Sequence, residues 1–510
     1  MKIVKRILVS LLVFTMVTAC IAGCGSSTKT GKGEGTSKTD IEIKVWNSGL
    51  GTDWLDAMIE GFKKVHPEYN VYYTASASEK AVTTAYGLAD VDTTDLYMVT
   101  KIHDTSNMEP LNDLLNSTAD GDTKPLIEKF NESYLTMEKT SDGTIYSITY
   151  GGGVVGIVYN KDFFKEAGIE QLPRTTNELA IVCNTLSTKG ITPLCHFKLG
   201  GYWHFIEEDW YGQYEGVDNY LNFYQNPTKD LLLAKDGRYE TLKAMEKFIT
   251  PEYVLSGSNS SDHTTIQTKF LLGQAAMMVS GSWLANEMKS TEGALDNFVT
   301  MKLPVLSGIT NKLTTVKKES DLRKVIAAID AVTDGEADIT TYQKGADYEV
   351  DGITVSAADW DYLYAARNTV TQNYAGHGAF IPTYSNAKEG AKEFIKFMYS
   401  DAGYQIYLDA LHIELPMQLS SGEVDKSDWN AFEIGQSDLL NTCVQTFSKS
   451  NRGKHALFSE GGAALMADVS HVDEFCSKNA ADRMSADEIW NKIVKYVNNK
   501  YEATWLANIN

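Results

Sequence analysis

The side chains that could do chemistry in this sequence are aromatic rings at the ends of short apolar runs. The clearest example is Gly281-Ser282-Trp283, which follows the apolar run 275–279. A bounded apolar run of this length is typical of a buried strand, and the turn of small residues carries the indole out of its end. In open α/β sheets, ligands bind in the crevice beyond the carboxyl ends of the strands, which is where this indole would lie. We therefore expect Trp283 to contact a ligand without covalent chemistry.

Other rings stand beside glycines or at predicted strand ends in the same way. Trp46 closes the alternating run 41–46, Tyr150 precedes three glycines, and Trp203 and Trp210 lie in an aromatic-rich stretch after two glycines. His377 lies between two further glycines. We expect all five side chains to contact the ligand. For Trp203 and Trp210 the alternative is a helix that packs its aromatic residues inward.

The first part of the folded chain alternates strands and helices. Strands are predicted at 41–46, 71–74 and 95–99, and a helix with one apolar face at 54–65. This order indicates a parallel sheet with helices on its faces. Ligands of such sheets bind in the crevice beyond the carboxyl ends of the strands, so polar residues in the loops that follow are candidate contacts: Asn47, Glu79, Lys101 and Asp104.

Composition and spacing exclude several other kinds of site. The 67 Asp and Glu against 46 Lys and Arg, a net charge of −21, argue against nucleic-acid binding, which requires clustered positive charge. No Cys-x-x-Cys or His-x-x-x-His spacing supports a metal site. The glycines at 151–153 are not followed by the Gly-Lys-Ser/Thr of a phosphate-binding loop. No cofactor is expected.

The N-terminus is predicted to contain a signal peptide followed by a flexible tether. Cations precede the apolar run 7–19, which is too short to span a bilayer but is typical of a secretory signal. Ile21-Ala22-Gly23-Cys24 resembles the lipobox of bacterial lipoproteins, so residues 1–23 would be removed and Cys24 lipidated. Cys20 is a looser alternative. Residues 24–40, rich in Gly, Ser, Thr and Lys, are predicted to be a flexible tether.

Three stretches resemble the family 1 extracellular solute-binding proteins, which are receptors of ATP-driven sugar importers. Residues 270–283 fit the pattern F-x-x-G-x-A-A-M-x-x-x-G-S-W, and the stretches 66–70 and 159–169 are similar to the family as well. The resemblance implies an α/β fold of two lobes, the type II periplasmic-binding-protein-like fold, with a mainly parallel sheet flanked by helices in each lobe. It assigns 41–150 plus 299–388 to the first lobe, and 151–298 plus 389–510 to the second.

The resemblance also implies a function and a mode of action. We expect an extracytoplasmic, lipid-anchored monomer that captures a carbohydrate between its lobes and delivers it to the permease subunits of an ABC transporter. It would not be an enzyme. Gly151, Gly152 and Gly153 resemble the first crossing between lobes and could absorb hinge rotation. The stretch 298–305 resembles the strand that returns to the first lobe, and 311–372 is predicted to be a surface elaboration with helices near 322–332 and 356–370.

Two other functions and the state of the cysteines stay open. An extracellular glycoside hydrolase needs two carboxylates about 5–9.5 Å apart, and no motif selects such a pair. A peptide receptor or a sensor's accessory binding protein is the other alternative. Besides Cys20 and Cys24 the chain has Cys183, Cys195, Cys443 and Cys476, which the sequence leaves as disulfides (Cys183 with Cys195, Cys443 with Cys476) or as buried thiols.

Overall fold

The computed structural model describes most of the chain after the predicted tether. The described residues are 38–88, 92–102, 104–140, 142–226, 228–290, 295–333, 344–371, 376–442, 445–447 and 470–500. The predicted signal segment, Cys20, Cys24 and Cys443 lie outside them. The first strand begins at Thr39, one residue before the predicted end of the tether at residue 40. None of the helices in the described ranges has the length and apolar character needed to cross a bilayer.

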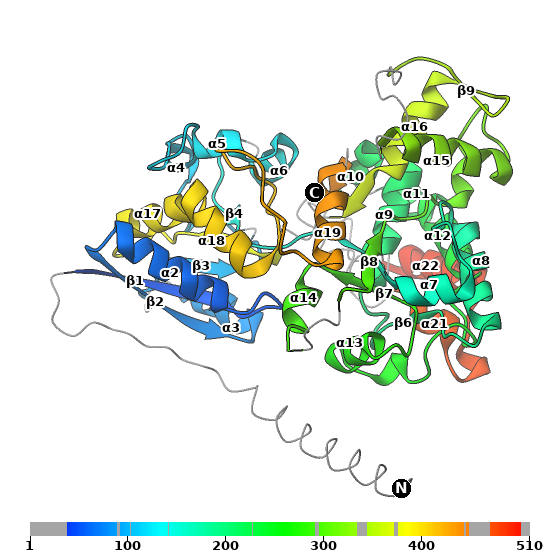
Figure 1. Ribbon diagram of the computed structural model, residues 1–510, viewed down its shortest axis with the longest axis horizontal. Coiled ribbons are helices and arrows are strands. Elements are labelled where there is room, and N and C mark those ends of the chain that lie inside the picture. The colour runs from blue at the N-terminus through cyan, green and yellow to red at the C-terminus, as the bar shows by residue number, and fades with distance from the viewer. Residues whose placement is uncertain are drawn as a thin grey trace, which may run out of the picture.

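The first lobe is built on a five-stranded sheet (Figure 1). Its order is β2-β1-β3-β12-β4, with β1 parallel to β2 and β3, and β12 antiparallel to both its neighbours. The strands are β1 (Thr39–Trp46), β2 (Tyr69–Ser76), β3 (Leu96–Val99), β4 (Ile148–Thr149) and β12 (Gly378–Phe380). All strands but β12 therefore run the same way, and the three strands predicted at the start of the chain are confirmed.

Helices cover both faces of this sheet (Figure 1). They are α2 (Asp53–Val65), α3 (Glu79–Tyr86), α4 (Asn112–Leu115), α5 (Leu126–Lys129), α6 (Glu132–Glu138), α17 (Lys388–Met398) and α18 (Asp401–Leu411). The predicted helix 54–65 is confirmed, and it buries Trp54, Leu55 and Phe62.

The placement of α17 and α18 in the second lobe is wrong. Phe394 of α17 packs edge-on against Phe62 of α2, with ring centroids 5.2 Å apart. Gly390 lets α17 approach the sheet, because a Cβ there would lie 2.8 Å from a side-chain carbon of Ile41. The apolar face of α17 therefore closes the core of the first lobe, and α18 packs on α2 beside it.

The second lobe is built on a four-stranded sheet of order β6-β7-β5-β8. Its strands are β5 (Val155–Asn160), β6 (Leu194–Cys195), β7 (Met277–Gly281) and β8 (Phe298–Met301). β6 is parallel to β7, whereas β5 is antiparallel to β7 and β8. Each sheet thus has one strand that opposes the others, and the predicted fold class of two lobes with mainly parallel sheets is confirmed.

The other elements surround the second sheet (Figure 1). The helices are α7 (Lys161–Ala167), α8 (Thr176–Thr188), α9 (Trp203–Glu215), α10 (Val217–Gln225), α11 (Lys229–Leu233), α12 (Gly237–Met245), α13 (His263–Leu271), α14 (Trp283–Glu287), α15 (Glu319–Thr333), α16 (Ala357–Arg367), α19 (Ala431–Thr442), α21 (Val472–Cys476) and α22 (Ala486–Lys500). A hairpin of β9 (Tyr348–Val350) and β10 (Ile353–Val355), and the pair β11 (Thr369–Thr371) with β13 (Gln445–Phe447), complete the lobe.

The stretch 298–305 does not return to the first lobe, so that prediction is wrong. β8 pairs with β5 at the edge of the second sheet, and Phe298 packs against Phe270 of α13 with ring centroids 4.7 Å apart. The helices predicted within 311–372 are confirmed as α15 and α16. They pack on each other, and α16 packs on α9, so this insertion enlarges the second lobe.

Three of the cysteines carry free, buried thiols. Cys183, Cys195 and Cys476 are unbridged, which excludes the Cys183–Cys195 disulfide that the sequence left open. Burial raises the pKa values of the Cys183 and Cys195 thiols well above the usual range, and it raises the pKa of Cys476 to about 12. These thiols are therefore core residues with little nucleophilic character.

Candidate functional site

The turn that the sequence singled out joins β7 to α14. β7 ends at Gly281 and α14 begins at Trp283, so the predicted order of strand, small-residue turn and indole is confirmed. The indole folds back over the turn, because a Cβ on Gly281 would lie 2.4 Å from Cζ3 of Trp283. Only glycine leaves room for the ring there. Trp283 is 6 % exposed, so it is more enclosed than a ring projecting freely from a strand end.

Three side chains are linked to this indole: Tyr202 at the start of α9, Gln267 of α13, and Glu287 of α14 itself. We call Tyr202, Gln267, Trp283 and Glu287 the Trp283 cluster. Tyr202 lies edge-on to Trp283 with ring centroids 5.2 Å apart, and Gln267 Nε2 donates to the Glu287 carboxylate at 2.5 Å. Trp283 and Glu287 share one face of α14 because they are four residues apart. That spacing is the signal by which the sequence could have shown Glu287, which the predictions missed.

The enclosed Trp283 cluster contains two ionisable groups, Glu287 and Tyr202, with raised pKa values. Burial raises the pKa of Glu287, and the hydrogen bond from Gln267 offsets only part of that. Burial, together with the charge of Glu287, also raises the pKa of the Tyr202 hydroxyl. Nε1 of Trp283 lies near that hydroxyl without the geometry of a hydrogen bond. The cluster thus presents a carboxylate, an amide and two aromatic groups to one small region.

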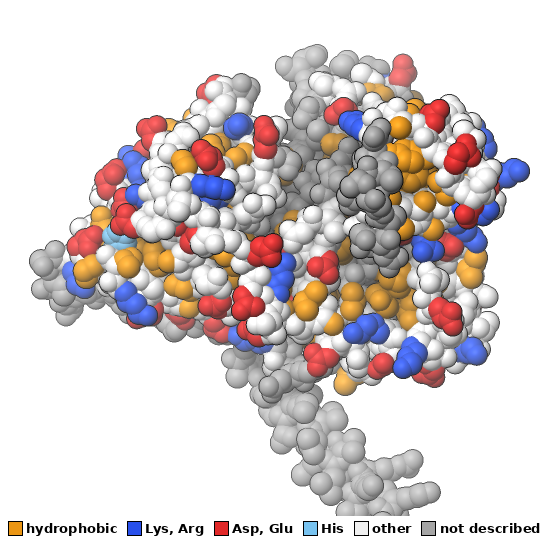
Figure 2. All heavy atoms as spheres, turned by 45° about the horizontal axis from the view of Figure 1, so that its top comes forward, with side chains coloured by type: hydrophobic (Ala, Val, Ile, Leu, Met, Phe, Trp, Pro, Cys, Tyr) orange, Lys and Arg blue, Asp and Glu red, His pale blue; other side chains and the backbone are white. Residues whose placement is uncertain are grey.

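The first lobe touches the cluster through the loop after β1. Gly49 lies so close to α14 that a Cβ on it would be 2.7 Å from Glu287 Oε1 and 3.0 Å from Cβ of Trp283. Asn286 Nδ2 donates to the Gly49 carbonyl at 2.7 Å. Lys289 and Asp53 form an exposed ion pair at 2.5 Å. The Trp283 cluster therefore lies at the seam between the lobes, which Figure 2 shows as two masses side by side.

Three predicted contacts come together on the first-lobe side. Trp46, at the end of β1, stacks on His377 with ring centroids 5.6 Å apart. His377 Nε2 lies 3.0 Å from Oγ of Ser48, and Tyr150 meets the imidazole edge-on at 5.3 Å. Tyr150 is 1 % exposed and its hydroxyl donates to the Met98 carbonyl at 3.2 Å. Tyr150 therefore packs against His377, which in turn stacks on Trp46, and Trp46 is the half-buried ring of the three.

The triple glycine is the segment that crosses from one sheet to the other. β4 ends at Thr149 in the first sheet and β5 begins at Val155 in the second. Gly152 and Gly153 have φ angles of +124° and +137°, which favour glycine. Ser282 Oγ donates to the Gly152 carbonyl at 2.8 Å, so the crossing is held directly beside Trp283.

Gly153→Ala is expected to destabilise the protein by about 1–3 kcal/mol, because the new Cβ is strained at this φ and would lie 1.9 Å from Oγ of Ser282. Thermal unfolding measures the loss. Gly121→Ala is the matched control, since Gly121 has a φ of +89° with no heavy atom near its Cβ position. Equal losses in both variants would show that the contact with Ser282 places no constraint on the crossing.

The sequence matches the family described as bacterial extracellular solute-binding proteins over residues 48–405. The match spans both lobes and the crossing between them. The chain belongs to this family.

Solved structures show the same fold as this solute-binding protein. A chitin oligosaccharide binding protein superposes with a TM-score of 0.62 at 17 % identity, covering 91 % of this chain and 99 % of that one. The bacterial solute receptor AcbH, whose described preference is for β-D-galactopyranose, superposes with a TM-score of 0.63 at 11 % identity, covering 91 % of this chain and 99 % of that one. RafE in complex with raffinose gives 0.61 at 13 % identity, also over 91 % and 99 %.

Curated relatives match only part of this solute-binding protein. Binding proteins of Brucella abortus and Brucella suis are 25 % identical over 181 residues, which is 36 % of this chain. The match spans 41 % of the length of those relatives.

The polar residues predicted at the first sheet's carboxyl edge do not form one group. Lys101 Nζ donates to Glu138 at 2.8 Å and to the Met137 carbonyl at 3.2 Å, so it is held within the first lobe. Asp104 is exposed and accepts from the backbone N–H of Ser106 at 3.0 Å. Glu79 is half-buried at the start of α3. Asn47 is exposed in the loop that carries Gly49, which approaches α14.

Trp203 and Trp210 lie in the core of the second lobe, which is the alternative that the sequence left open. They are 1 % and 0 % exposed, their rings lie 6.3 Å apart, and Trp210 Nε1 donates to the Pro304 carbonyl at 2.9 Å. The ring that reaches the Trp283 cluster from this stretch is Tyr202, directly before α9. Nothing in the local pattern distinguished Tyr202 from its aromatic neighbours.

Helix α9 also buries an acid, which yields a pH prediction. Burial raises the pKa of Glu207 to about 7, from an ordinary value of 4.5, although Ser470 donates to it. Because the folded-state pKa is raised, the protonated form stabilises the fold below about pH 4.5, and this contribution is lost as the pH rises through 7. Glu207→Gln is therefore expected to be more stable than the parent by up to about 3 kcal/mol at pH 8.5, and equally stable at pH 4.

Unfolding of both proteins across this pH range measures the difference. Glu60→Gln serves as the control, because the Glu60 side chain is 70 % exposed. If the free energies of unfolding of the parent and of Glu207→Gln changed with pH in parallel, the buried, proton-binding role of Glu207 would be contradicted.

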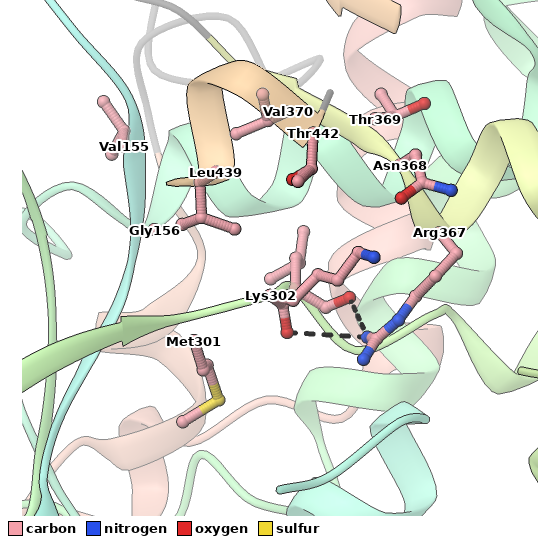
Figure 3. Close-up of a pocket in the computed structure, with 11 residues that line it drawn as sticks. Val155, Gly156, Met301, Lys302, Arg367, Asn368, Thr369, Val370, Leu439 and Thr442 are labelled. Carbon is pink, nitrogen blue, oxygen red and sulfur yellow. Dashed lines mark hydrogen bonds between the residues drawn. The ribbon is translucent and has the colours of Figure 1, made fainter. Parts of the chain in front are cut away.

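Two cavities lie near the lobe boundary. One is lined by Gly153, Ser282, Ile413 and Trp429, directly beside the crossing. The other lies between β8, α19 and the junction of α16 with β11 (Figure 3). Arg367 at its rim donates to the Leu303 carbonyl at 2.8 Å and to Asp330 at 2.7 and 2.9 Å. Within the described ranges, no three His, Cys, Asp or Glu side chains are grouped to hold a metal ion.

Proposed function

We propose that this protein is the substrate-binding lipoprotein of an ABC transporter and captures a carbohydrate, most simply an oligosaccharide, between its lobes. Lipidation at Cys24 would anchor it outside the cytoplasmic membrane, and the tether would let it reach the permease as a monomer. It would bind and release its solute without converting it. The family membership and the carbohydrate ligands named for AcbH, RafE and the chitin oligosaccharide binding protein support this proposal.

The observation that carries the proposal is the Trp283 cluster at the seam. An indole, a phenol, a carboxylate and a carboxamide lie together there, and these are the groups that a pyranose ring needs for stacking and for directed hydrogen bonds. The first lobe closes over the cluster through Gly49. A solute held by both lobes stabilises the closed arrangement by its differential affinity for that state.

A thermal-shift screen against mono- and oligosaccharides tests the function. We expect at least one carbohydrate to raise the melting temperature, with affinity confirmed by titration calorimetry and no release of reducing ends on long incubation. Peptides and amino acids serve as the comparison set. Stabilisation by peptides alone, or turnover of an oligosaccharide, would contradict the proposal.

A further inference from the structure

We infer that Glu287 selects the solute by its charge, so that the site accepts neutral or amino-bearing carbohydrates and rejects acidic ones such as uronates. This inference rests on the proposed function and adds the substrate class. It is carried by the unpartnered polar atoms of the Trp283 cluster, and by the carboxylate of Glu287, which pairs with no Lys or Arg among the described residues.

Two polar atoms of the cluster are buried without a hydrogen-bond partner among the described residues. They are Nε1 of Trp283, which can only donate, and Oε1 of Gln267, which can only accept. Trp283 is 6 % and Gln267 1 % exposed. Because Nε2 of Gln267 donates to Glu287, the free Oε1 lies on the same carboxamide, next to that carboxylate. Buried polar atoms normally have partners, so this pair is explained if a solute group supplies them.

The chemistry of the unpartnered atoms selects among solute groups. A hydroxyl can accept from the indole N–H and donate to the Glu287 carboxylate or the Gln267 carbonyl. An ammonium group can donate to both oxygens. A carboxylate only accepts, so it could pair with the indole alone and would leave Gln267 unsatisfied beside a like charge. Hydroxyl-bearing and amino-bearing solutes therefore fit the cluster, and acidic ones do not.

Several buried carboxylates of the fold pair with a cation, whereas Glu287 does not. Arg367 pairs with Asp330 at 2.7 Å, Lys129 with Asp122 at 2.7 Å, and Lys101 with Glu138 at 2.8 Å. No Lys or Arg in the described ranges makes an ion pair with Glu287, and the ionisable side chain that lowers its pKa is His263. Lys289, two residues along, is exposed and pairs with Asp53 instead. Burial of this uncompensated carboxylate makes a second negative charge unfavourable there.

Because of its position, Glu287 would select solutes by charge as the two lobes close. Its Oε1 faces Gly49, so the carboxylate is covered when the loop after β1 meets α14. A solute that reaches Glu287 must enter while the lobes are apart, and it is then enclosed with the carboxylate away from water. Charge repulsion is strongest in such an enclosed site.

The test compares carbohydrates that differ in charge alone. Purified parent and Glu287→Gln proteins are titrated with gluco- and galacto-oligosaccharides of two to four units, with the corresponding oligouronates, and with glucosamine oligomers. We expect the parent to bind a neutral or amino member at least about 10-fold more tightly than the matched uronate. In Glu287→Gln the neutral sugar should bind about 10-fold more weakly, since a hydrogen bond to a charged group is lost, and the preference over the uronate should shrink by a similar factor.

Controls keep the outcomes distinct. Glu389→Gln removes a first-lobe carboxylate whose side chain is 81 % exposed, and it should leave every affinity unchanged. A parent that binds the uronate as tightly as the neutral sugar would overturn the inference while leaving carbohydrate binding intact, and this comparison needs no variant. An unchanged preference in folded Glu287→Gln would overturn it as well. A parent that binds none of these compounds would contradict the proposed function together with the inference.

Discussion

Replacing Trp283 by alanine is expected to weaken carbohydrate binding by about 30-fold or more, because a central aromatic anchor contributes about 2 kcal/mol or more to binding. The indole supplies the stacking face at the seam and the one N–H donor in the cluster that lacks a partner. Titration calorimetry with the best carbohydrate from the screen measures the change. Trp283→Phe, which keeps a ring but removes Nε1, should lie between the parent and the alanine variant.

Stability must be separated from binding in this experiment, because Trp283 is 6 % exposed and its loss leaves a cavity. Trp210→Phe is the matched control. It removes a fully buried indole N–H that bonds to Pro304, on a helix of the same lobe. We expect it to lower the melting temperature and to leave affinity unchanged. Equal losses of affinity in Trp283→Phe and Trp210→Phe would show that binding depends on the core of the lobe and not on the seam.

Lys129→Met is expected to destabilise the protein by about 3–5 kcal/mol, which is the usual cost of leaving buried charges without their partner. The Lys129 side chain is fully buried, and Nζ donates to Asp122 and Asp401 at 2.7 Å and to the Tyr399 carbonyl at 2.8 Å. Although burial alone would raise the pKa of Asp401, hydrogen bonds from Lys129 and Ser420 hold it well below its usual range. The variant would leave two carboxylates facing each other inside the first lobe.

Urea or thermal unfolding measures this loss. Lys63→Met provides the comparison, because Lys63 pairs with Glu60 at the surface, and such exposed pairs contribute less than about 1 kcal/mol. The restoring double variant, Lys129→Met with Asp122→Leu, should recover part of the stability if uncompensated charge is the cause. A single variant as stable as Lys63→Met would contradict the buried network.

Local patterns predicted the elements well. The alternation 41–46, the apolar face of 54–65 and the Gly-bounded run before Trp283 each depend on neighbours within one strand or helix. The glycines at 151–153 were predicted to cross between the lobes, and the two sheets do meet at this segment. Their role as a hinge stays a prediction.

Contacts between distant segments were not predictable from the same patterns. Trp203 and Trp210 have the composition of a binding surface, and only the packing of α9 shows that they face inward. Lys101 is held by Glu138, 37 residues away, and Gln267 reaches Glu287 from another helix. β8 was assigned to the first lobe and lies in the second, and α17 was assigned to the second lobe and lies in the first. An amphipathic segment shows which of its faces is buried but not which sheet buries it.

The most direct test of the central claim is small-angle X-ray scattering of the protein with and without its best carbohydrate, on the parent and on Trp283→Ala. The account predicts that saturating carbohydrate lowers the radius of gyration of the parent, because a solute held by both lobes favours the closed arrangement. The same concentration should leave Trp283→Ala unchanged. A parent that binds carbohydrate tightly with no change in its scattering would contradict capture between the lobes.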